Sequence, residues 1–178
     1  STVSNASDLV RLGAIAAKYP VLMEIAAQKS ADFPFSGRLY NYNGALGTAG
    51  INGLKTGNND QNLGGLLTTG MTNTGGKNVL FSGAVLGASS LQEAISDSKK
   101  LATSISANLQ TTPVAEPKTV VAAATTEWGE TIPVQTSTAI TVTRWADHAI
   151  NISLSQPAAT NDAGSLVTSV NGKRSSSP

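Results

Sequence analysis

Residues 50–88 constrain the fold most, because strand-like runs alternate there with strong turn signals. Apolar and threonine-rich runs at 51–56, 63–72 and 79–86 predict three strands. The last two are separated by Asn-Thr-Gly-Gly at 73–76, a composition typical of a tight hairpin turn. Apolar residues then recur at helical spacing over 91–109, after Ser89 and Ser90 as candidate capping residues. We therefore predict a three-stranded antiparallel meander followed by a helix.

The first of these strands carries Gly53-Leu54-Lys55-Thr56-Gly57 near its end. Lysine supplies a positive charge with three donors, and threonine supplies a hydroxyl that can donate or accept. A glycine after them leaves no side chain between the strand and a bound molecule. The three residues Lys-Thr-Gly alone would also fit a strand that runs into a turn. A phosphate loop is excluded, because the glycine spacing and the strand-then-helix setting are absent.

The segment before the meander is predicted to be mainly helical. Ser7 is the expected N-cap of a first helix, with Asp8 in its first turn and Tyr19 at its end. Pro20 closes that helix and opens a second, because proline is tolerated at the first helical position. We expect the buried face of this second helix to consist of Val21, Leu22, Ile25 and Ala26. Phe33 and Phe35 predict an edge strand around Pro34, and 38–47 is expected to be a loop.

A second domain is expected after residue 110. Two prolines and the lack of periodicity at 111–117 predict a linker. Short strand-like runs at 118–126, 132–134, 140–144, 150–154 and 165–170 predict a small β-sandwich over 118–172. The tail at 173–178 is expected to be disordered. The predicted fold class is therefore α+β, with domains at 1–110 and 118–172.

Composition excludes several classes of function. The chain has 178 residues and a net charge of +1, which gives no electrostatic case for binding nucleic acid. It has no cysteine, which excludes disulfides, thiolate zinc sites and cysteine nucleophiles. The single histidine, His148, is interpreted as a surface residue, so no metal or cofactor is expected. No run is long and apolar enough to cross a bilayer, and no signal peptide is found. We expect a mature piece or an excised part of a longer product.

Several motifs follow one another in a familiar order. A helix begins Ala6-Ser7-Asp8-Leu9, and a Tyr19-Pro20 break and an Asn41-x-Asn43 loop precede 50–57. Val-Leu-Gly-Ala-Ser at 85–89 and Asp-Ser-Lys-Lys-Leu at 97–101 complete the series. This order closely resembles the C-terminal half of the catalytic domain of low-molecular-mass penicillin-binding D-alanyl-D-alanine carboxypeptidases, in which Lys-Thr-Gly is one of three signatures. The β-rich remainder resembles their second, non-catalytic domain, with Glu-Trp-Gly at 127–129, so the resemblance covers roughly 2–171.

The resemblance implies a β-lactamase/transpeptidase-like fold and a role for each motif residue. Lys55 would help bind the terminal carboxylate of the substrate and tune proton transfers, and Thr56 would offer its hydroxyl to the same carboxylate. Gly57 would let an acyl-D-Ala-D-Ala strand lie along the sheet edge. The backbone N–H of Asn58 would be one of two oxyanion-hole donors. The implied substrates are peptidoglycan stem peptides and β-lactams, without a cofactor. The implied location of the protein is extracellular, at the cell wall or membrane surface, as in Gram-positive bacteria.

The sequence departs from the family pattern in two ways. Many relatives carry an arginine early in the helix after the last strand, and the matching position is Ala94. In the family, Ser-x-x-Lys and Ser-x-Asn precede the region where this chain begins. Here Ser96 to Lys99 matches the first pattern, and Ser106 to Asn108 and Ser169 to Asn171 match the second. All three follow Lys-Thr-Gly, and the first two lie on a helix expected behind the sheet, so we interpret them as chance matches.

Two hypotheses about function remain open. In the first, the chain is part of a serine-type D-Ala-D-Ala carboxypeptidase, and an N-terminal portion or companion chain supplies the nucleophile. In the second, it is a non-catalytic binding or structural module of the cell wall. Under the first hypothesis, the chain alone should expose apolar surface or pair with another polypeptide, since a bare sheet edge and a missing helical layer would remain. Trp128 and Trp145 are expected in the sandwich core or at a domain interface.

Overall fold

The computed structural model describes residues 3–59, 63–125 and 127–150. The chain divides into two compact units between Leu109 and Gln110, and its helices and antiparallel strands confirm the α+β class. No helix among the described residues is long and apolar enough to span a membrane.

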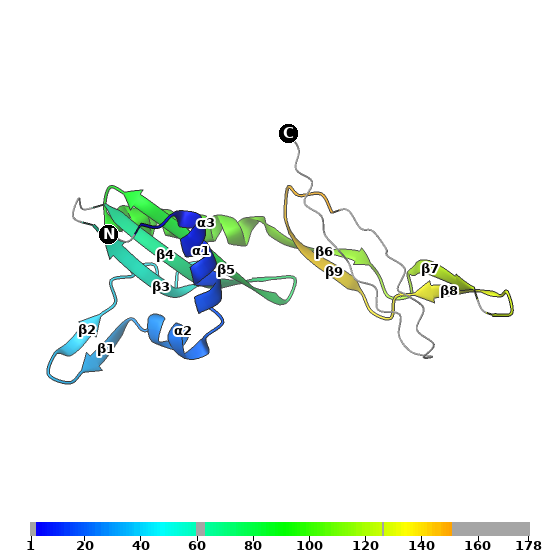
Figure 1. Ribbon diagram of the computed structural model, residues 1–178, viewed down its shortest axis with the longest axis horizontal. Coiled ribbons are helices and arrows are strands. Elements are labelled where there is room, and N and C mark those ends of the chain that lie inside the picture. Colours follow the sequence, from blue (N-terminus) through cyan, green and yellow to red (C-terminus); the bar gives the residue numbers. More distant parts are fainter. Residues whose placement is uncertain (1–2, 60–62, 126, 151–178) are drawn as a thin grey trace. The chain divides into compact units, whose positions relative to one another are not determined.

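The first unit contains three helices, a hairpin and a three-stranded sheet (Figure 1). In chain order its elements are α1 (Ala6–Ala16), α2 (Pro20–Ala26), β1 (Ser30–Phe33), β2 (Gly37–Tyr40), β3 (Ile51–Asn58), β4 (Gly64–Thr74), β5 (Lys77–Ala88) and α3 (Leu91–Asn108). The sheet has the order β3-β4-β5 with both pairs antiparallel, so the predicted meander is confirmed. Strand β3, which carries the Lys-Thr-Gly motif, is therefore an edge strand of this sheet.

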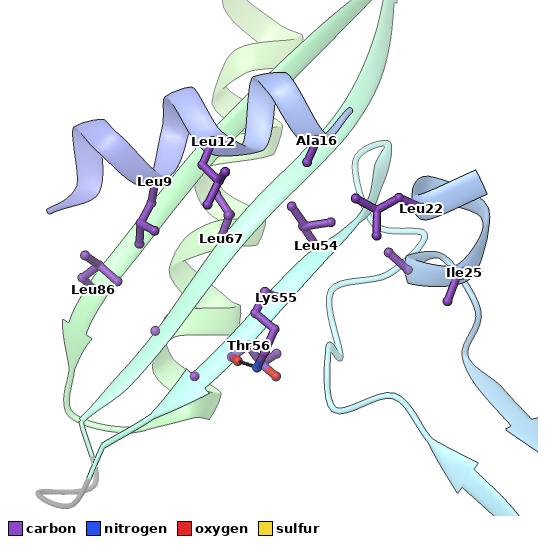
Figure 2. Close-up of a pocket in the computed structure, with 13 residues that line it drawn as sticks. Leu9, Leu12, Ala16, Leu22, Ile25, Leu54, Lys55, Thr56, Leu67 and Leu86 are labelled. Atoms are coloured by element: carbon purple, nitrogen blue, oxygen red, sulfur yellow. Dashed lines mark hydrogen bonds between the residues drawn. The ribbon is translucent and has the colours of Figure 1, made fainter. Parts of the chain in front are cut away.

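Helices α1 and α3 cover opposite faces of the sheet, as Figure 2 also shows. Neighbouring residues in a strand point to opposite sides, and Leu66 and Leu67 of β4 illustrate this. Leu66 is fully buried in the core with residues of α3. Leu67 faces α1, where a Cβ added to Gly13 would lie 3.0 Å from its Cδ1 and 2.3 Å from Ser82 Oγ. A glycine at position 13 thus lets α1 approach the sheet closely.

The main hydrophobic core lies on the α3 face. It brings together three strands, the loop before β3 and the helix: Ala45, Ile51, Leu66, Phe81, Ala94, Ile95 and Ala102. Helix α3 begins at the predicted cap, because the Ser90 side chain accepts a hydrogen bond from the Glu93 N–H. Glu93 in turn accepts from the N–H and the hydroxyl of Ser89. The pKa of Glu93 is lowered mainly by these hydrogen bonds to Ser89.

The predicted start of α1 was wrong by two residues. The N-cap is Asn5, whose Oδ1 accepts from the Asp8 N–H at 2.9 Å, whereas Ser7 lies inside the first turn. Asparagine is as good a cap as serine, and it reaches the third helical N–H from this position. Asp8 does lie in the first turn, where the Asn5 Nδ2 also donates to its carboxylate at 2.8 Å.

The region between α2 and β3 contains a strand, β2, where the sequence predicts a loop. Strands β1 and β2 form an antiparallel hairpin that pairs Ser30 with Tyr40 and Phe33 with Gly37. Arg38 holds Asp32 across this hairpin through two hydrogen bonds of 3.0 and 2.9 Å, which lower the pKa of the Asp32 carboxyl. Strand β2 forms because its residues pair with β1, and sequence periodicity does not predict such pairing.

The second unit contains four described strands. They are β6 (Leu109–Ala115), β7 (Val120–Thr125), β8 (Thr131–Gln135) and β9 (Ile140–Trp145), in the pairs β6-β9 and β7-β8. Residues 111–115 of the expected linker at 111–117 are part of strand β6. The strands expected at 150–154 and 165–170 and the tail at 173–178 lie outside the described residues, except for Ile150. The complete sandwich over 118–172 stays a prediction.

Candidate functional site

The Lys-Thr-Gly residues lie together on the edge strand β3. In the register of the sheet, Lys55 is opposite Leu67, Thr56 is opposite Leu66 and Gly57 is opposite Gly65. Lys55, Gly57 and Asn58 are exposed, and Thr56 is partly buried. The Lys55 ammonium donates a hydrogen bond to the Thr56 carbonyl, so it stays at the strand edge (Figure 2). The motif therefore presents a cation, a hydroxyl and open backbone on one accessible strand.

A groove of about 550 Å³ lies beside this strand. Three groups of residues without polar side chains line it: Leu9, Leu12 and Ala16 from α1; Leu22, Ile25 and Ala26 from α2; and Leu54, Gly65, Leu67 and Leu86 from the sheet. Lys55, Thr56 and Gly57 complete the lining, and Figure 2 shows Lys55 and Thr56 on strand β3. Among these lining residues, Lys55 is the one that carries a charge.

The groove explains why the buried face predicted for α2 was wrong. The exposed fractions of Val21, Leu22 and Ile25 are 69%, 43% and 60%. Leu22 and Ile25 face the groove instead of a packed neighbour among the described residues. The apolar surface predicted for the chain alone is therefore present, because Leu12 and Leu86 are also 54% and 45% exposed. In the sequence, this exposed apolar surface corresponds to the apolar stripe of α2, whose spacing predicts a buried face.

The glycine of the motif is not required by the packing of this chain. A Cβ added to Gly57 would meet no heavy atom within 4 Å, and its φ lies outside the left-handed region. In contrast, a Cβ at Gly64 would lie 2.1 Å from the Ser90 carbonyl oxygen, and one at Gly70 would lie 2.2 Å from Phe81 Cζ. Glycines 64 and 70 are therefore needed for close packing, whereas Gly57 leaves open space above the strand.

Two of the three chance matches to the serine patterns of the family lie on α3, away from the groove. Ser96 and Lys99 are on α3, which packs on the opposite face of the sheet. The Ser106 hydroxyl donates to the Ala102 carbonyl, and Asn108 Nδ2 donates to the Ser104 carbonyl, so both are used within their own helix. Ser169 and Asn171 lie outside the described residues.

The structure places Ala94 and Trp128 differently from the sequence-based expectation. Ala94 is fully buried in the core on the α3 face, so a side chain at this position would not point into the groove, and our match to the arginine position was wrong. Trp128 is 88% exposed and is not part of a core, whereas Trp145 is partly buried in β9. His148 is exposed as predicted. No cluster of three metal-ligating side chains exists among the described residues.

Comparison with known proteins identifies the fold. No protein-family model matches the sequence, and no curated protein matches it significantly. Penicillin binding protein 5 from Haemophilus influenzae aligns with a TM-score of 0.60 and 22% identity, over 86% of this chain and 45% of its own. PBP3 from Streptococcus pneumoniae, described as a peptidoglycan synthesis regulatory factor, aligns with a TM-score of 0.58 and 20% identity, over 89% of this chain and 46% of its own.

These likenesses concern the fold, since both identities are low. The chain spans about half the length of the two solved structures, because it covers 45% and 46% of them. The fold inferred from the order of sequence motifs is thereby confirmed, with β3 as the strand that carries Lys-Thr-Gly. The chain has the fold of about half of a penicillin-binding protein.

Proposed function

We propose that this chain is part of a serine-type D-Ala-D-Ala carboxypeptidase that acts on peptidoglycan stem peptides. The observation that carries the proposal is the presence of Lys55, Thr56 and Gly57 on the accessible edge strand of a penicillin-binding-protein fold. In this proposal the protein works outside the cytoplasm, at the cell wall or membrane surface, where peptidoglycan is found.

The side chains of the motif suit a carboxylate. Lys55 is the single charged residue among those lining the groove, and its exposed ammonium can donate to an anion there. The Thr56 hydroxyl is next to it on the strand and can donate to the same carboxylate oxygens. Together they would hold the C-terminal carboxylate of a D-Ala-D-Ala peptide or the equivalent group of a β-lactam.

The backbone of β3 suits an extended peptide. An edge strand has N–H and C=O groups free on its outer side, and a peptide can pair with them as an added strand. The open space above Gly57 would let the peptide lie close to the strand. The backbone N–H of Asn58, at the end of β3, would then be one of the two donors to the oxyanion formed during acylation.

The remaining groups of the reaction would come from polypeptide outside these 178 residues. A serine nucleophile with its lysine, and the Ser-x-Asn residues, would be supplied by an N-terminal portion or a companion chain. The apolar groove supports this part of the proposal, because four of its side chains are 43–60% exposed beside the motif: Leu12, Leu22, Ile25 and Leu86. Burying them against a further layer would be favourable by about 25 cal/mol per Å².

The test is labelling with a fluorescent penicillin, followed by intact-mass analysis of the native polypeptide and of anything that co-purifies. We expect a covalent adduct on the portion or companion that carries the nucleophile. Lys55→Ala and Thr56→Val should slow acylation by about 10²–10³, the loss typical for one group that stabilises the transition state. Lys18→Ala, an exposed lysine outside the groove, is the matched control and should leave the rate unchanged.

The second candidate is a non-catalytic cell-wall module. It is favoured by one observation: the residues lining the groove include no serine, cysteine, histidine, aspartate or glutamate. Retention of the chain on purified peptidoglycan without any penicillin adduct would support this module. An adduct on Ser96 of this chain would contradict both proposals, since that serine lies on the opposite face of the sheet.

A further inference from the structure

The hairpin of β1 and β2 stands apart from the rest of the first unit. Figure 1 shows it extending away from the three-stranded sheet, and no other described helix or strand packs extensively against it. Its base is fixed by Asn41, whose N–H donates to the Lys29 carbonyl at 2.9 Å and whose Nδ2 donates to the carbonyls of Ala26 and Gln28 at 3.2 and 3.0 Å. The hairpin is thus a projecting element on a fixed base.

The register of the hairpin gives it one apolar face. Side chains directly opposite each other on two paired strands share a face, and neighbours in one strand alternate. Phe33 and Leu39 therefore lie on the same face, where they are 51% and 49% exposed, whereas the ion pair of Asp32 and Arg38 lies on the other. A two-stranded hairpin by itself is marginally stable in water at best, so burying this apolar face would stabilise it.

The turn at the end of the hairpin exposes a second phenylalanine. Phe35 is fully exposed, and its φ of +67° lies in the left-handed region, which bulky side chains rarely adopt. Strained positions of this kind concentrate at functional sites. Phe33, Pro34 and Phe35 follow one another at the tip, and residues 33–37 include no charged side chain. The end of the hairpin is therefore apolar and faces outward.

Aromatic and basic residues gather on and around the hairpin. The chain has three phenylalanines and three tyrosines, and two of each lie within 33–42, where all four are exposed. Between 25 and 59 the chain carries three cationic residues, Lys29, Arg38 and Lys55, against one carboxylate, Asp32. Arg38 binds that carboxylate, so no negative charge of this segment is left unpaired. Aromatic rings and basic side chains are the residues enriched where proteins meet the headgroups of a membrane.

We propose that the hairpin binds the surface of a lipid bilayer that contains anionic lipids. Phe33, Phe35 and Leu39 enter the boundary between headgroups and acyl chains, and Lys29 and Tyr40 stay at the level of the headgroups. A bilayer accepts a projecting apolar tip without a matching pocket, and its negative surface is complementary to the basic segment. The proposal does not depend on the carboxypeptidase function, because the hairpin residues line no part of the groove beside β3.

The experiment is cosedimentation of the full chain with vesicles of phosphatidylcholine and phosphatidylglycerol, compared with vesicles of phosphatidylcholine alone. We expect binding to the mixed vesicles that weakens with added salt but persists in part, because salt screens the charges and not the apolar contacts.

A single fluorescent label tests the place of the contact. The chain has no cysteine, so Ser36→Cys gives one labelling position at the tip of the hairpin. Nitroxide-labelled lipids should quench an environment-sensitive fluorophore attached there. The same fluorophore on Ser96→Cys, a matched position exposed on α3, should not be quenched.

Substitutions separate the apolar and the electrostatic contributions. Phe33→Ser and Phe35→Ser should each weaken vesicle binding by about tenfold, the factor expected when a phenylalanine no longer leaves water for an apolar phase. Lys29→Gln should weaken binding to the mixed vesicles by about fivefold and leave binding to phosphatidylcholine alone unchanged. Leu101→Ser, which replaces a half-exposed apolar side chain on α3, is the matched control and should change neither.

Three results would overturn the proposal. The first is that the folded wild-type chain does not sediment with the mixed vesicles. The second is binding that survives both phenylalanine substitutions but is lost in Ile25→Gln, which would place the contact at the groove. The third is a label at position 36 that responds to a companion polypeptide and not to vesicles, which would make the hairpin a protein interface. If a phenylalanine variant does not fold, quenching of the label at position 36 decides the matter by itself.

Discussion

The glycine at the end of the motif offers a test that separates folding from function. A Cβ at Gly57 would meet no heavy atom of this chain within 4 Å, and its backbone conformation is open to any residue. Glycine inside a strand is less favourable than alanine by roughly 0.5–1 kcal/mol, because it loses more backbone entropy on folding. Gly57→Ala should therefore leave the free energy of unfolding unchanged or raise it by about that amount.

Gly70→Ala is the matched control in the neighbouring strand β4. Its Cβ would lie 2.2 Å from Phe81 Cζ and 2.7 Å from the Gly50 carbonyl oxygen. Phe81 is 8% exposed and belongs to the core, so its ring has little room to move. Forcing an extra methyl group into a packed core typically costs about 1–3 kcal/mol, and the free energy of unfolding should fall by this amount.

Urea denaturation followed by circular dichroism measures both effects. With a slope of about 1–3 kcal/mol per M, a loss of about 2 kcal/mol lowers the midpoint by roughly 1 M. In the proposed assembled enzyme, Gly57→Ala should nevertheless slow acylation by penicillin, because its methyl group would stand where the substrate strand is proposed to lie. If Gly57→Ala lowers the midpoint as much as Gly70→Ala, the glycine is required for folding and its interpretation as an opening for substrate is refuted.

Three further outcomes are expected. Ser90→Ala should lower the free energy of unfolding by about 1 kcal/mol through loss of the α3 cap, and an equal loss in the exposed helical control Ser96→Ala would contradict this. The lowered pKa of Glu93 means that its carboxylate stabilises the fold above the pKa of the unfolded state, and this stabilisation is lost as pH falls through the lower folded pKa; the acid side of the stability profile should therefore flatten in Glu93→Gln. The groove should bind the dye ANS, and Leu12→Gln and Ile25→Gln should reduce that binding more than Leu101→Gln, a control on α3 that is 49% exposed; equal reductions would show that the dye binds elsewhere.

Some elements followed from local chemistry and could be predicted. The meander depends on strand-forming runs divided by a glycine-rich turn, and Gly75 and Gly76 of the Asn-Thr-Gly-Gly segment do connect β4 and β5, whereas Asn73 and Thr74 end β4. The start of α3 depends on one capping serine. Strands β2 and β6 were missed, because each depends on pairing with a partner strand and not on its own periodicity. The cap of α1 was misplaced because Asn5 and Ser7 are both good capping residues.

The sequence by itself determined the motif, since Lys55, Thr56 and Gly57 are consecutive and any strand keeps them together. Only the tertiary structure decided what surrounds them. The pairing of β3 on one side alone makes it an edge, and the packing of α1 on one face and α3 on the other assigns each apolar residue to the groove or to the core. Burial is a property of the whole fold, because a side chain is buried only by the residues that pack against it.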